Sequence, residues 1–230
     1  MLEIKEYTYN ELSQIFGTSD RQGIKRKLRS YDIKYETQGR GERTVYKILE
    51  IPNKFKLFCI TELQFPAQAN FEKMLYYYYY FFNDDTFAGL PNQEQANIFM
   101  EQLFNVSRQT IANWVRYLEQ ANYVYLSNYD CKYYAVTKDK FTGQKLLTEI
   151  SHEKYSRGWS AYWGIRRERP REESGFAWRE AMEIWGGCAC KHRLPLQNAF
   201  YIDKIEELIN IINDIVSDKI LNGEIPASLF

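Results

Sequence analysis

The sequence has few of the residues that build disulfide frameworks. Only four of its 230 residues are cysteines, and their spacing is too uneven for the linked pairs of a small secreted domain. We therefore expect reduced thiols at Cys59, Cys131, Cys188 and Cys190. No uninterrupted apolar run approaches the roughly 18 to 20 residues of a membrane-spanning helix, and the start "MLEIKEYTYNEL" lacks the pattern of a signal peptide. These features predict a cytoplasmic protein.

Sequence patterns of common active sites are also missing. The chain has two histidines, His152 and His192, and neither stands beside an evident acid and nucleophile. It contains no phosphate-binding glycine loop of the usual spacing and no nucleophile elbow. Carboxylates are plentiful, so a metal-dependent nuclease stays open as an alternative. We expect a protein that is not an enzyme and that uses no cofactor.

Apolar residues are abundant, and charge is distributed unevenly. Hydrophobic residues make up 45% of the chain, as expected for a folded protein with two or three small domains. The net charge is zero, which is unusual for a nucleic-acid-binding protein. However, residues 20–47 carry nine basic and four acidic side chains, whereas residues 201–230 carry two and six. This segregation indicates a basic patch near the N-terminus and an acidic tail. The basic patch could bind a ligand, or it could be an ordinary solvated surface.

Residues 1–51 have the pattern of two short helices and a hairpin. Thr8 or Asn10 can cap the first helix, which ends at Gly17, and Ser19 or Asp20 can cap the second. The stretch "IKYETQGRGERTVYKI" alternates apolar and polar residues around a glycine turn, as a hairpin does. The polar side chains of the second helix and the hairpin are Arg21, Gln22, Lys25, Arg26, Arg29, Arg40 and Arg43.

This order of elements resembles the winged helix-turn-helix modules of excisionase-like and MerR-like DNA-binding proteins. The resemblance implies that the second helix enters the major groove and that the hairpin lies on phosphates or in the minor groove. By residue type, the basic residues of the helix would divide between base edges and phosphates. Gln22 would suit an adenine, and Arg40 and Arg43 would hold the flanking backbone. A protein-binding winged domain is the alternative.

Residues 68–137 predict a second module of the same kind. The run "QANFEKMLYYYYYFFNDD" favours a helix with tyrosines in the core over an aromatic platform for nucleic acids. Farther along, Asn105 is expected to form a left-handed turn, Val106 to enter the core and Ser107 to cap a helix. The outward polar residues of that helix are Arg108, Gln109, Asn113 and Arg116.

The stretch "VSRQTIANWVRYLEQANYV" looks like the recognition helix and following strand of winged-helix regulators of the GntR and MarR type. After it, "YVYLSNYDCKYYAV" predicts a hairpin about Asn128 to Asp130. Residues 94–150 carry six basic and six acidic side chains. This module could therefore read DNA or serve as a scaffold or partner-binding unit.

Residues 138–230 predict a helical C-terminal domain. Four tryptophans are expected to anchor its helices: Trp159, Trp163, Trp178 and Trp185. The stretch "RRERPREE" is expected to form a solvated loop, although its arginines Arg166, Arg167, Arg169 and Arg171 could grip phosphates. The last 30 residues contain an apolar helical stripe that the tryptophan-rich helices or a second subunit must cover, so a homodimer is an open alternative.

Cys188, Cys190 and His192 suggest a zinc site in "GGCACKHRLP". Structural zinc sites usually separate paired cysteines by at least two residues and need four ligands, so we expect no metal here.

The sequence predicts a mainly α protein with short β-hairpin wings. Two winged helix-turn-helix modules, residues 1–51 and 68–137, precede a helical domain at residues 138–230. This last domain is expected to bind a partner or to dimerise. The predicted function is sequence-specific binding of double-stranded DNA, as a transcriptional regulator of a bacterium or mobile element. The alternatives are a phage-encoded inhibitor of host defence, resembling anti-CRISPR proteins, that acts by protein binding, and a replication initiator.

Overall fold

The chain divides into two compact units. The computed structural model describes residues 2–40, 43–66, 68–101, 104–168 and 174–226. The first unit comprises Met1–Tyr79, Trp114–Tyr123 and Asn198–Phe230, and the second comprises Tyr80–Asn113 and Val124–Gln197. This division groups residues differently from the three segments predicted from the sequence. Within the described residues, no helix is both long enough and apolar enough to cross a membrane.

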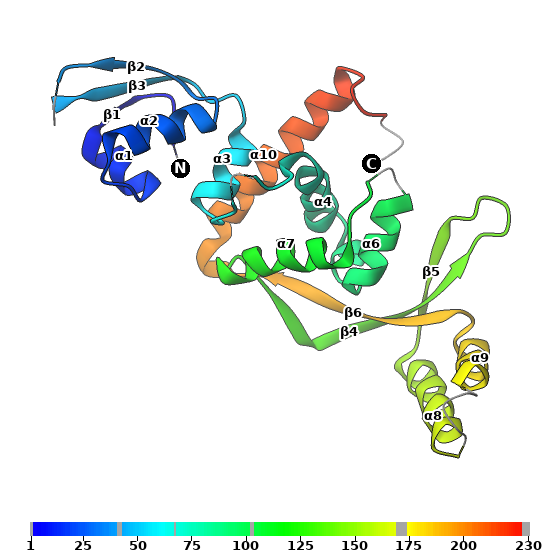
Figure 1. The fold of residues 1–230 in the computed structure, drawn as a ribbon. Helices are drawn as coiled ribbons and strands as arrows, with labels where there is room; N and C mark the ends of the chain where they lie inside the picture. The colour runs from blue at the N-terminus through cyan, green and yellow to red at the C-terminus, as the bar shows by residue number, and fades with distance from the viewer. Residues whose placement is uncertain (1, 41–42, 67, 102–103, 169–173, 227–230) are drawn as a thin grey trace. The chain divides into compact units, whose positions relative to one another are not determined.

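The N-terminal part of the first unit is a three-stranded antiparallel sheet with two helices (Figure 1). Its elements in chain order are β1 (Glu6–Thr8), α1 (Tyr9–Phe16), α2 (Arg21–Ser30), β2 (Lys34–Gln38) and β3 (Val45–Glu50). The strand order is β1-β3-β2. Helices and sheet share one apolar core, which includes Leu12, Phe16, Ile24, Leu28 and Tyr46. The two helices and the hairpin predicted for residues 1–51 are therefore confirmed.

Local side-chain signals set the ends of α1 and α2. Thr8 and Glu11 form a capping box, in which the Glu11 carboxylate accepts a hydrogen bond from the Thr8 backbone N at 2.7 Å. Gly17 ends α1 with φ 58°, a conformation that glycine adopts without strain. Asp20 caps α2 by accepting hydrogen bonds from two backbone amides of its first turn. Of the predicted alternatives, Thr8 rather than Asn10 caps α1, and Asp20 rather than Ser19 caps α2.

The rest of the first unit is helical. It contains α3 (Lys54–Thr61), most of α4 (Phe71–Asn83), the end of α7 (Arg108–Gln120), the 3-10 turn η3 (Ala199–Tyr201) and α10 (Ile202–Leu221). Three tyrosines of the aromatic run in α4, Tyr76, Tyr77 and Tyr78, are buried. The Tyr78 hydroxyl donates to the backbone O of Trp114 at 2.9 Å. These three tyrosines therefore belong to the core, as predicted.

Most of the apolar stripe of α10 is covered within the first unit, although Ile202 at its start is 38% exposed. Ile205, Leu208, Ile212 and Val216 are buried, and α10 packs against α3. The sequence prediction named the tryptophan-rich helices or a second subunit as the cover and omitted α3. Helices so distant in sequence share no local pattern that would pair them.

The second unit combines another antiparallel sheet with helices (Figure 1). Its elements are α5 (Asp85–Ala88), α6 (Asn92–Glu101), the start of α7, β4 (Val124–Lys138), β5 (Lys145–Ile150), α8 (His152–Glu168), α9 (Ser174–Trp185) and β6 (Cys188–Gln197). The strand order is β5-β4-β6. Strands β5 and β6 lie in the segment 138–230, which was predicted as a helical domain, so that prediction missed both strands although α8, α9 and α10 also lie there.

The predicted hairpin about Asn128 to Asp130 is also wrong. Strand β4 continues through these residues, and its pairing with β6 is irregular there. The Ser127 hydroxyl accepts hydrogen bonds from the backbone N of Tyr129 at 3.3 Å and of Asp130 at 3.2 Å. Polar residues that look like a turn in the sequence instead form an irregularity within one strand. The chain reverses between β4 and β5, at residues 139–144.

Helices α8 and α9 pack through tryptophans. The rings of Trp159, Trp178 and Trp185 lie 5.1 to 6.1 Å apart. Trp163 is 53% exposed, so its predicted role as an anchor is wrong. The charged stretch predicted to be a loop begins within α8, which ends at Glu168. Arg169 and Arg171 lie outside the described residues.

Candidate nucleic-acid interface

Helix α2 separates an apolar face from a basic one. Ile24 and Leu28 are completely buried and fix the helix against the core. On its other sides, the predicted contact residues Arg21, Gln22, Arg26 and Arg29 are exposed, and Lys25 is half-buried. The structure therefore gathers all five predicted residues on one short helix whose exposed surface is cationic.

Asp20 couples the cap of α2 to its basic surface. Its carboxylate accepts from the backbone N of Gln22 at 3.1 Å and of Gly23 at 2.9 Å, and it pairs with the Arg26 guanidinium at 3.2 Å. The hydrogen bond from the Gln22 amide, with further contributions from Gly23 and Arg26, holds the Asp20 pKa below its usual value. Arg26 also donates to the Gln22 backbone O at 3.3 Å, so two contacts orient its side chain along the helix.

Two further contacts position basic side chains, and the sequence analysis missed both. The Arg21 guanidinium lies 5.4 Å from the ring centroid of Tyr9, at the start of α1. The Lys27 ammonium donates to the backbone O of Phe16, at the end of α1, and is half-buried. Lys27 therefore serves the fold. Both contacts join residues of different helices, so spacing within either helix does not reveal them.

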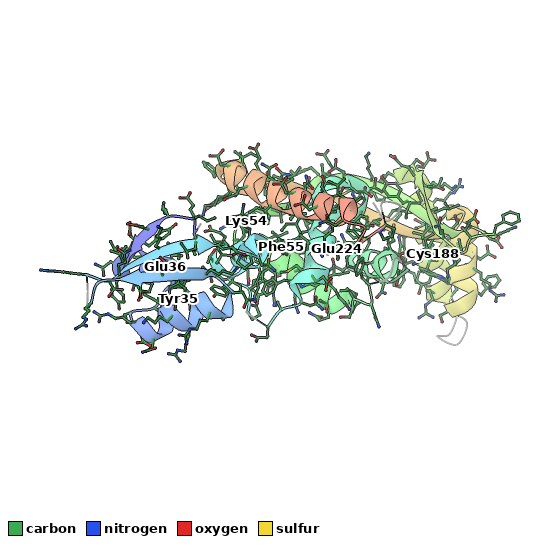
Figure 2. All side chains as sticks on the ribbon, turned by 90° about the horizontal axis from the view of Figure 1, so that it is seen from above. Tyr35, Glu36, Lys54, Phe55, Cys188 and Glu224 are labelled. Atoms are coloured by element: carbon green, nitrogen blue, oxygen red, sulfur yellow. The ribbon has the colours of Figure 1, made fainter. Side chains whose placement is uncertain are left out.

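The hairpin β2–β3 carries two exposed arginines close to its turn. Arg40 follows Gly39, whose φ is 85°, and Arg43 lies shortly before β3. A Cβ atom at Gly39 would lie 2.6 Å from the Arg43 backbone O, so the turn requires glycine both for its conformation and for its space. In β2, Tyr35 packs against Tyr46 of β3 with ring centroids 6.1 Å apart; Tyr35 is labelled in Figure 2.

Ion pairing leaves part of this surface without neutralising partners. Lys34 pairs with Glu50 at the end of the hairpin opposite the turn. Within the residues that the structure describes, no ion pair of 4.0 Å or less joins Arg29, Arg40 or Arg43 to an acid. These three exposed arginines are therefore candidates for contacts with an anionic ligand.

Helix α7 presents a second, less basic polar surface. Val106 is buried, and the Ser107 hydroxyl caps the helix by accepting from the Thr110 backbone N at 3.2 Å, as predicted. The predicted contact residues Arg108, Gln109 and Arg116 are exposed, whereas Asn113 is half-buried and its side chain accepts a hydrogen bond from Gln109 at 3.4 Å.

The left-handed turn predicted at Asn105 is wrong. In the described chain, the residues other than glycine with positive φ are Asp32, Gln64 and Asn122. The turn into α7 therefore does not depend on the conformation that favours glycine or asparagine.

The Cys188, Cys190 and His192 group on β6 has structural roles. Figure 2 labels Cys188 at the start of the strand. His192 is buried, and its Nε2 atom lies 2.7 Å from the backbone O of Asp85. Burial raises the pKa of the Cys190 thiol to about 11. The described residues contain no group of three or more His, Cys, Asp or Glu side chains placed to hold a metal ion.

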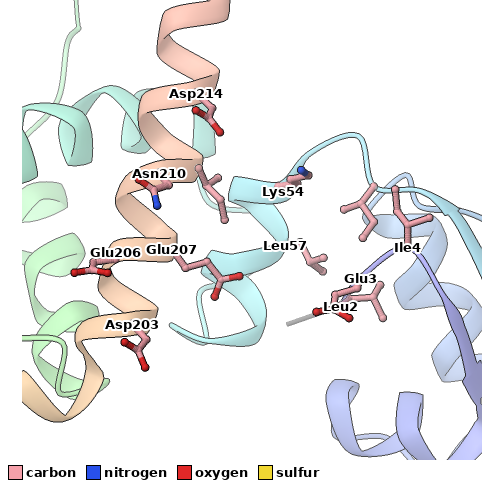
Figure 3. A pocket seen from close by; sticks show the side chains of 12 residues that line it. Leu2, Glu3, Ile4, Lys54, Leu57, Asp203, Glu206, Glu207, Asn210 and Asp214 are labelled. Carbon is pink, nitrogen blue, oxygen red and sulfur yellow. The ribbon is translucent and has the colours of Figure 1, made fainter.

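A groove of about 600 Å³ in the first unit was not predicted from the sequence (Figure 3). The lining opposite α10 includes four apolar residues and two charged ones, namely Leu2, Ile4, Ile51, Leu57, Glu3 and Lys54. Helix α10 contributes the polar wall, with Asp203, Glu206, Glu207, Asn210 and Asp214. Positions 203, 207, 210 and 214 recur at intervals of four, three and four, which places them on one helical face. The acidic tail thus borders an apolar-floored groove.

Comparisons with protein-family models, curated proteins and solved structures find no match for this chain. The geometry and charge of α2, its hairpin, α7 and the α10 groove are therefore the observations that bear on function.

Proposed function

We propose that the protein binds double-stranded DNA sequence-specifically through α2 and the β2–β3 hairpin, as a transcriptional regulator does. The observation that carries this proposal is the division of α2, which buries Ile24 and Leu28 and exposes a basic face. The order β1-α1-α2-β2-β3, with strands arranged β1-β3-β2, supports a winged helix-turn-helix module. A helix of this kind fits the major groove, and a basic hairpin fits the adjoining backbone or minor groove.

The contacts of α2 suggest different roles for its side chains. Arg29 has no acidic partner in the described chain and suits a guanine edge or a phosphate. Gln22 is exposed in the first turn and suits an adenine. Arg26 is held by Asp20 and suits a phosphate close to the helix N-terminus. Arg40 and Arg43 would contact the flanking backbone.

Helix α7 is proposed as a second contact surface through Arg108, Gln109 and Arg116. Its N-terminal cap, its buried apolar face and its exposed polar face are those of a recognition helix. Since basic and acidic residues balance over residues 94–150, we expect α7 to add less to affinity than α2 does.

The direct test is the salt dependence of duplex binding by the full chain. Five or so phosphate contacts predict an affinity that falls at least about a hundredfold between about 50 and 200 mM salt. Fluorescence anisotropy with labelled random and genomic duplexes measures both the slope and any sequence preference. Absence of binding at about 50 mM salt contradicts the proposal.

The groove beside α10 favours a second candidate function, which is binding of a partner protein. Its apolar floor and acidic wall complement a basic amphipathic helix, with apolar side chains on the floor and Lys or Arg along α10. An inhibitor of host defence that grips a protein, or a replication initiator that recruits one, would use such a surface.

A synthetic amphipathic peptide of lysine and leucine, about 15 residues long, tests this second candidate. We expect it to bind the full chain and to lose affinity when Asp203, Glu207 and Asp214 are changed to Lys. A variant with Lys at three exposed acids of the second unit, Glu149, Glu153 and Glu183, is the matched control. A peptide with glutamate in place of lysine should not bind. Equal binding of the lysine peptide by all three proteins contradicts a role for the groove.

A further inference from the structure

Phe141 stands at the turn between β4 and β5 with its side chain almost wholly in solvent. It is 98% exposed, the highest value among the described large hydrophobic residues. The ring contributes nothing to the core of the second unit. A single exposed apolar side chain is common on protein surfaces, so a binding role for this ring rests on the turn that carries it and on the charges beside it.

The turn that carries Phe141 is tightly built. The Asp139 carboxylate accepts from the backbone N of Phe141 at 2.9 Å, and from the backbone N and hydroxyl of Thr142 at 2.7 and 3.0 Å. The backbone N of Asp139 donates to Gln144 at 2.7 Å, and that of Gly143 donates to Asp139 at 3.0 Å. Gly143 has φ 73°. These bonds fix the backbone of Phe141, so its ring is presented by an ordered turn.

The charges around the turn favour an anionic partner. Lys138 precedes the turn and Lys140 lies within it, and both are exposed. The two lysines outnumber the Asp139 carboxylate, which accepts three hydrogen bonds within the turn. At the start of β5, Lys145 pairs with Glu94 of α6 at 3.1 Å, with side chains only 14% and 21% exposed. This pair ties the hairpin to the helical part of the second unit.

We propose that Phe141 is a wedge that inserts between base pairs in the minor groove of duplex DNA, with Lys138 and Lys140 on the flanking phosphates. The proposal rests on the DNA binding proposed above and adds a second hairpin contact of a different kind. Apolar side chains inserted in this way unstack a base step and bend the duplex. Flexible TA steps yield most easily, so the wedge predicts a preference for them.

The test uses the full chain and a duplex of about 30 base pairs of alternating T and A. The duplex carries 2-aminopurine at several adenine positions and a fluorescent energy-transfer pair at its two ends. Unstacking raises 2-aminopurine fluorescence, and bending raises energy transfer. We expect both signals with the wild-type protein and neither with Phe141→Ala, whose affinity falls about tenfold because one buried ring is lost. Phe141→Trp should retain both signals.

Phe200→Ala is the matched control, because Phe200 is 94% exposed but belongs to the first unit. It should behave like the wild type, and all variants should melt at the same temperature. Lys138→Ala with Lys140→Ala should lower the salt slope by about two.

Four outcomes overturn the proposal, and they are distinguishable. If the wild type binds neither this duplex nor random and genomic duplexes at about 50 mM salt, the proposed function fails and the wedge fails with it. If the wild type binds DNA but gives neither signal on this duplex, the wedge alone is wrong. If Phe141→Ala keeps the unstacking and bending signals, the wedge is wrong while DNA binding stands. If Phe141 instead mediates binding to vesicles of phosphatidylserine and phosphatidylcholine, with no unstacking of DNA, the turn is a membrane contact.

Discussion

The Arg26 guanidinium lies 3.2 Å from the carboxylate of Asp20, the residue that caps the helix carrying Arg26. One acid thus serves both the fold and the charge of the proposed interface. Its hydrogen bonds to the first turn stabilise α2, while its charge offsets one arginine of the basic face. The two roles can be separated by substitution, because asparagine caps a helix about as well as aspartate but carries no charge.

Asp20→Asn should therefore keep the stability of the first unit and bind duplex DNA several-fold more tightly than the wild type, whereas Asp20→Ala should lower the melting temperature.

The folded-state pKa of Asp20 is depressed. The ionised carboxylate therefore stabilises the fold above the unfolded pKa of about 3.9, and this stabilisation is lost as the pH falls through the folded-state pKa. Thermal melts between pH 2 and 7 should show a weaker acid dependence in Asp20→Asn. An unchanged dependence in that variant contradicts the assigned role of the carboxylate.

Charge reversal of Arg29 and Arg40 should separate DNA binding from folding. Both side chains are exposed and have no acidic partner within 4.0 Å in the described chain, so the double change to Glu should leave the melting temperature nearly unchanged. Duplex affinity should fall about a hundredfold or more, because each lost contact costs about 1 to 3 kcal/mol.

Lys132→Glu with Arg179→Glu is the control for that experiment. These two basic residues are also exposed and lie on β4 and α9 of the second unit. Anisotropy titrations at one salt concentration compare the two proteins directly. Equal losses of affinity in both would point to general charge attraction and would count against an interface on α2 and its hairpin.

Much of the N-terminal module could be predicted because its signals are local. Thr8, Gly17 and Asp20 act on amides or carbonyls within a few residues, and the alternation around Gly39 is a property of two adjacent strands. The exposed positions on α2 follow from helical spacing once Ile24 and Leu28 are placed inside.

Features that depend on distant residues were not predictable in the same way. The stretch at Asn128 contains turn-forming residues, yet β4 continues through it and pairs with β6 on both sides, at Leu126 and at Cys131. Trp163 is a large aromatic residue of the kind that often packs between helices, but its position on α8 leaves it exposed. The groove wall at Asp203 and Glu207 forms opposite residues near the N-terminus, and no local pattern relates two segments so far apart.

The four thiols should react at two different rates. Cys59 and Cys190 are buried, and burial raises both pKa values, that of Cys190 to about 11. Because the thiolate is the reactive form, only about one part in a thousand of Cys190 is ionised at pH 8. Cys131 and Cys188 are partly exposed. Titration with a chromogenic disulfide reagent should therefore modify these two in the native protein and all four after unfolding, and rapid modification of Cys190 contradicts the burial described for β6.

The packing of α8 against α9 depends on the absence of a side chain at Gly158. A Cβ atom there would lie 2.1 Å from Nε1 of Trp185, the same atom that donates to the Tyr155 backbone O at 3.0 Å. Gly158→Ala should displace this indole and destabilise the second unit by about 1 to 3 kcal/mol. Gly164 lies on the same helix with nothing within 4 Å of its Cβ position, so Gly164→Ala should stabilise the helix by about 0.5 to 1 kcal/mol. Urea unfolding followed by tryptophan fluorescence measures both changes, and equal stabilities of the two variants would show that the contact at Trp185 is not as close as described.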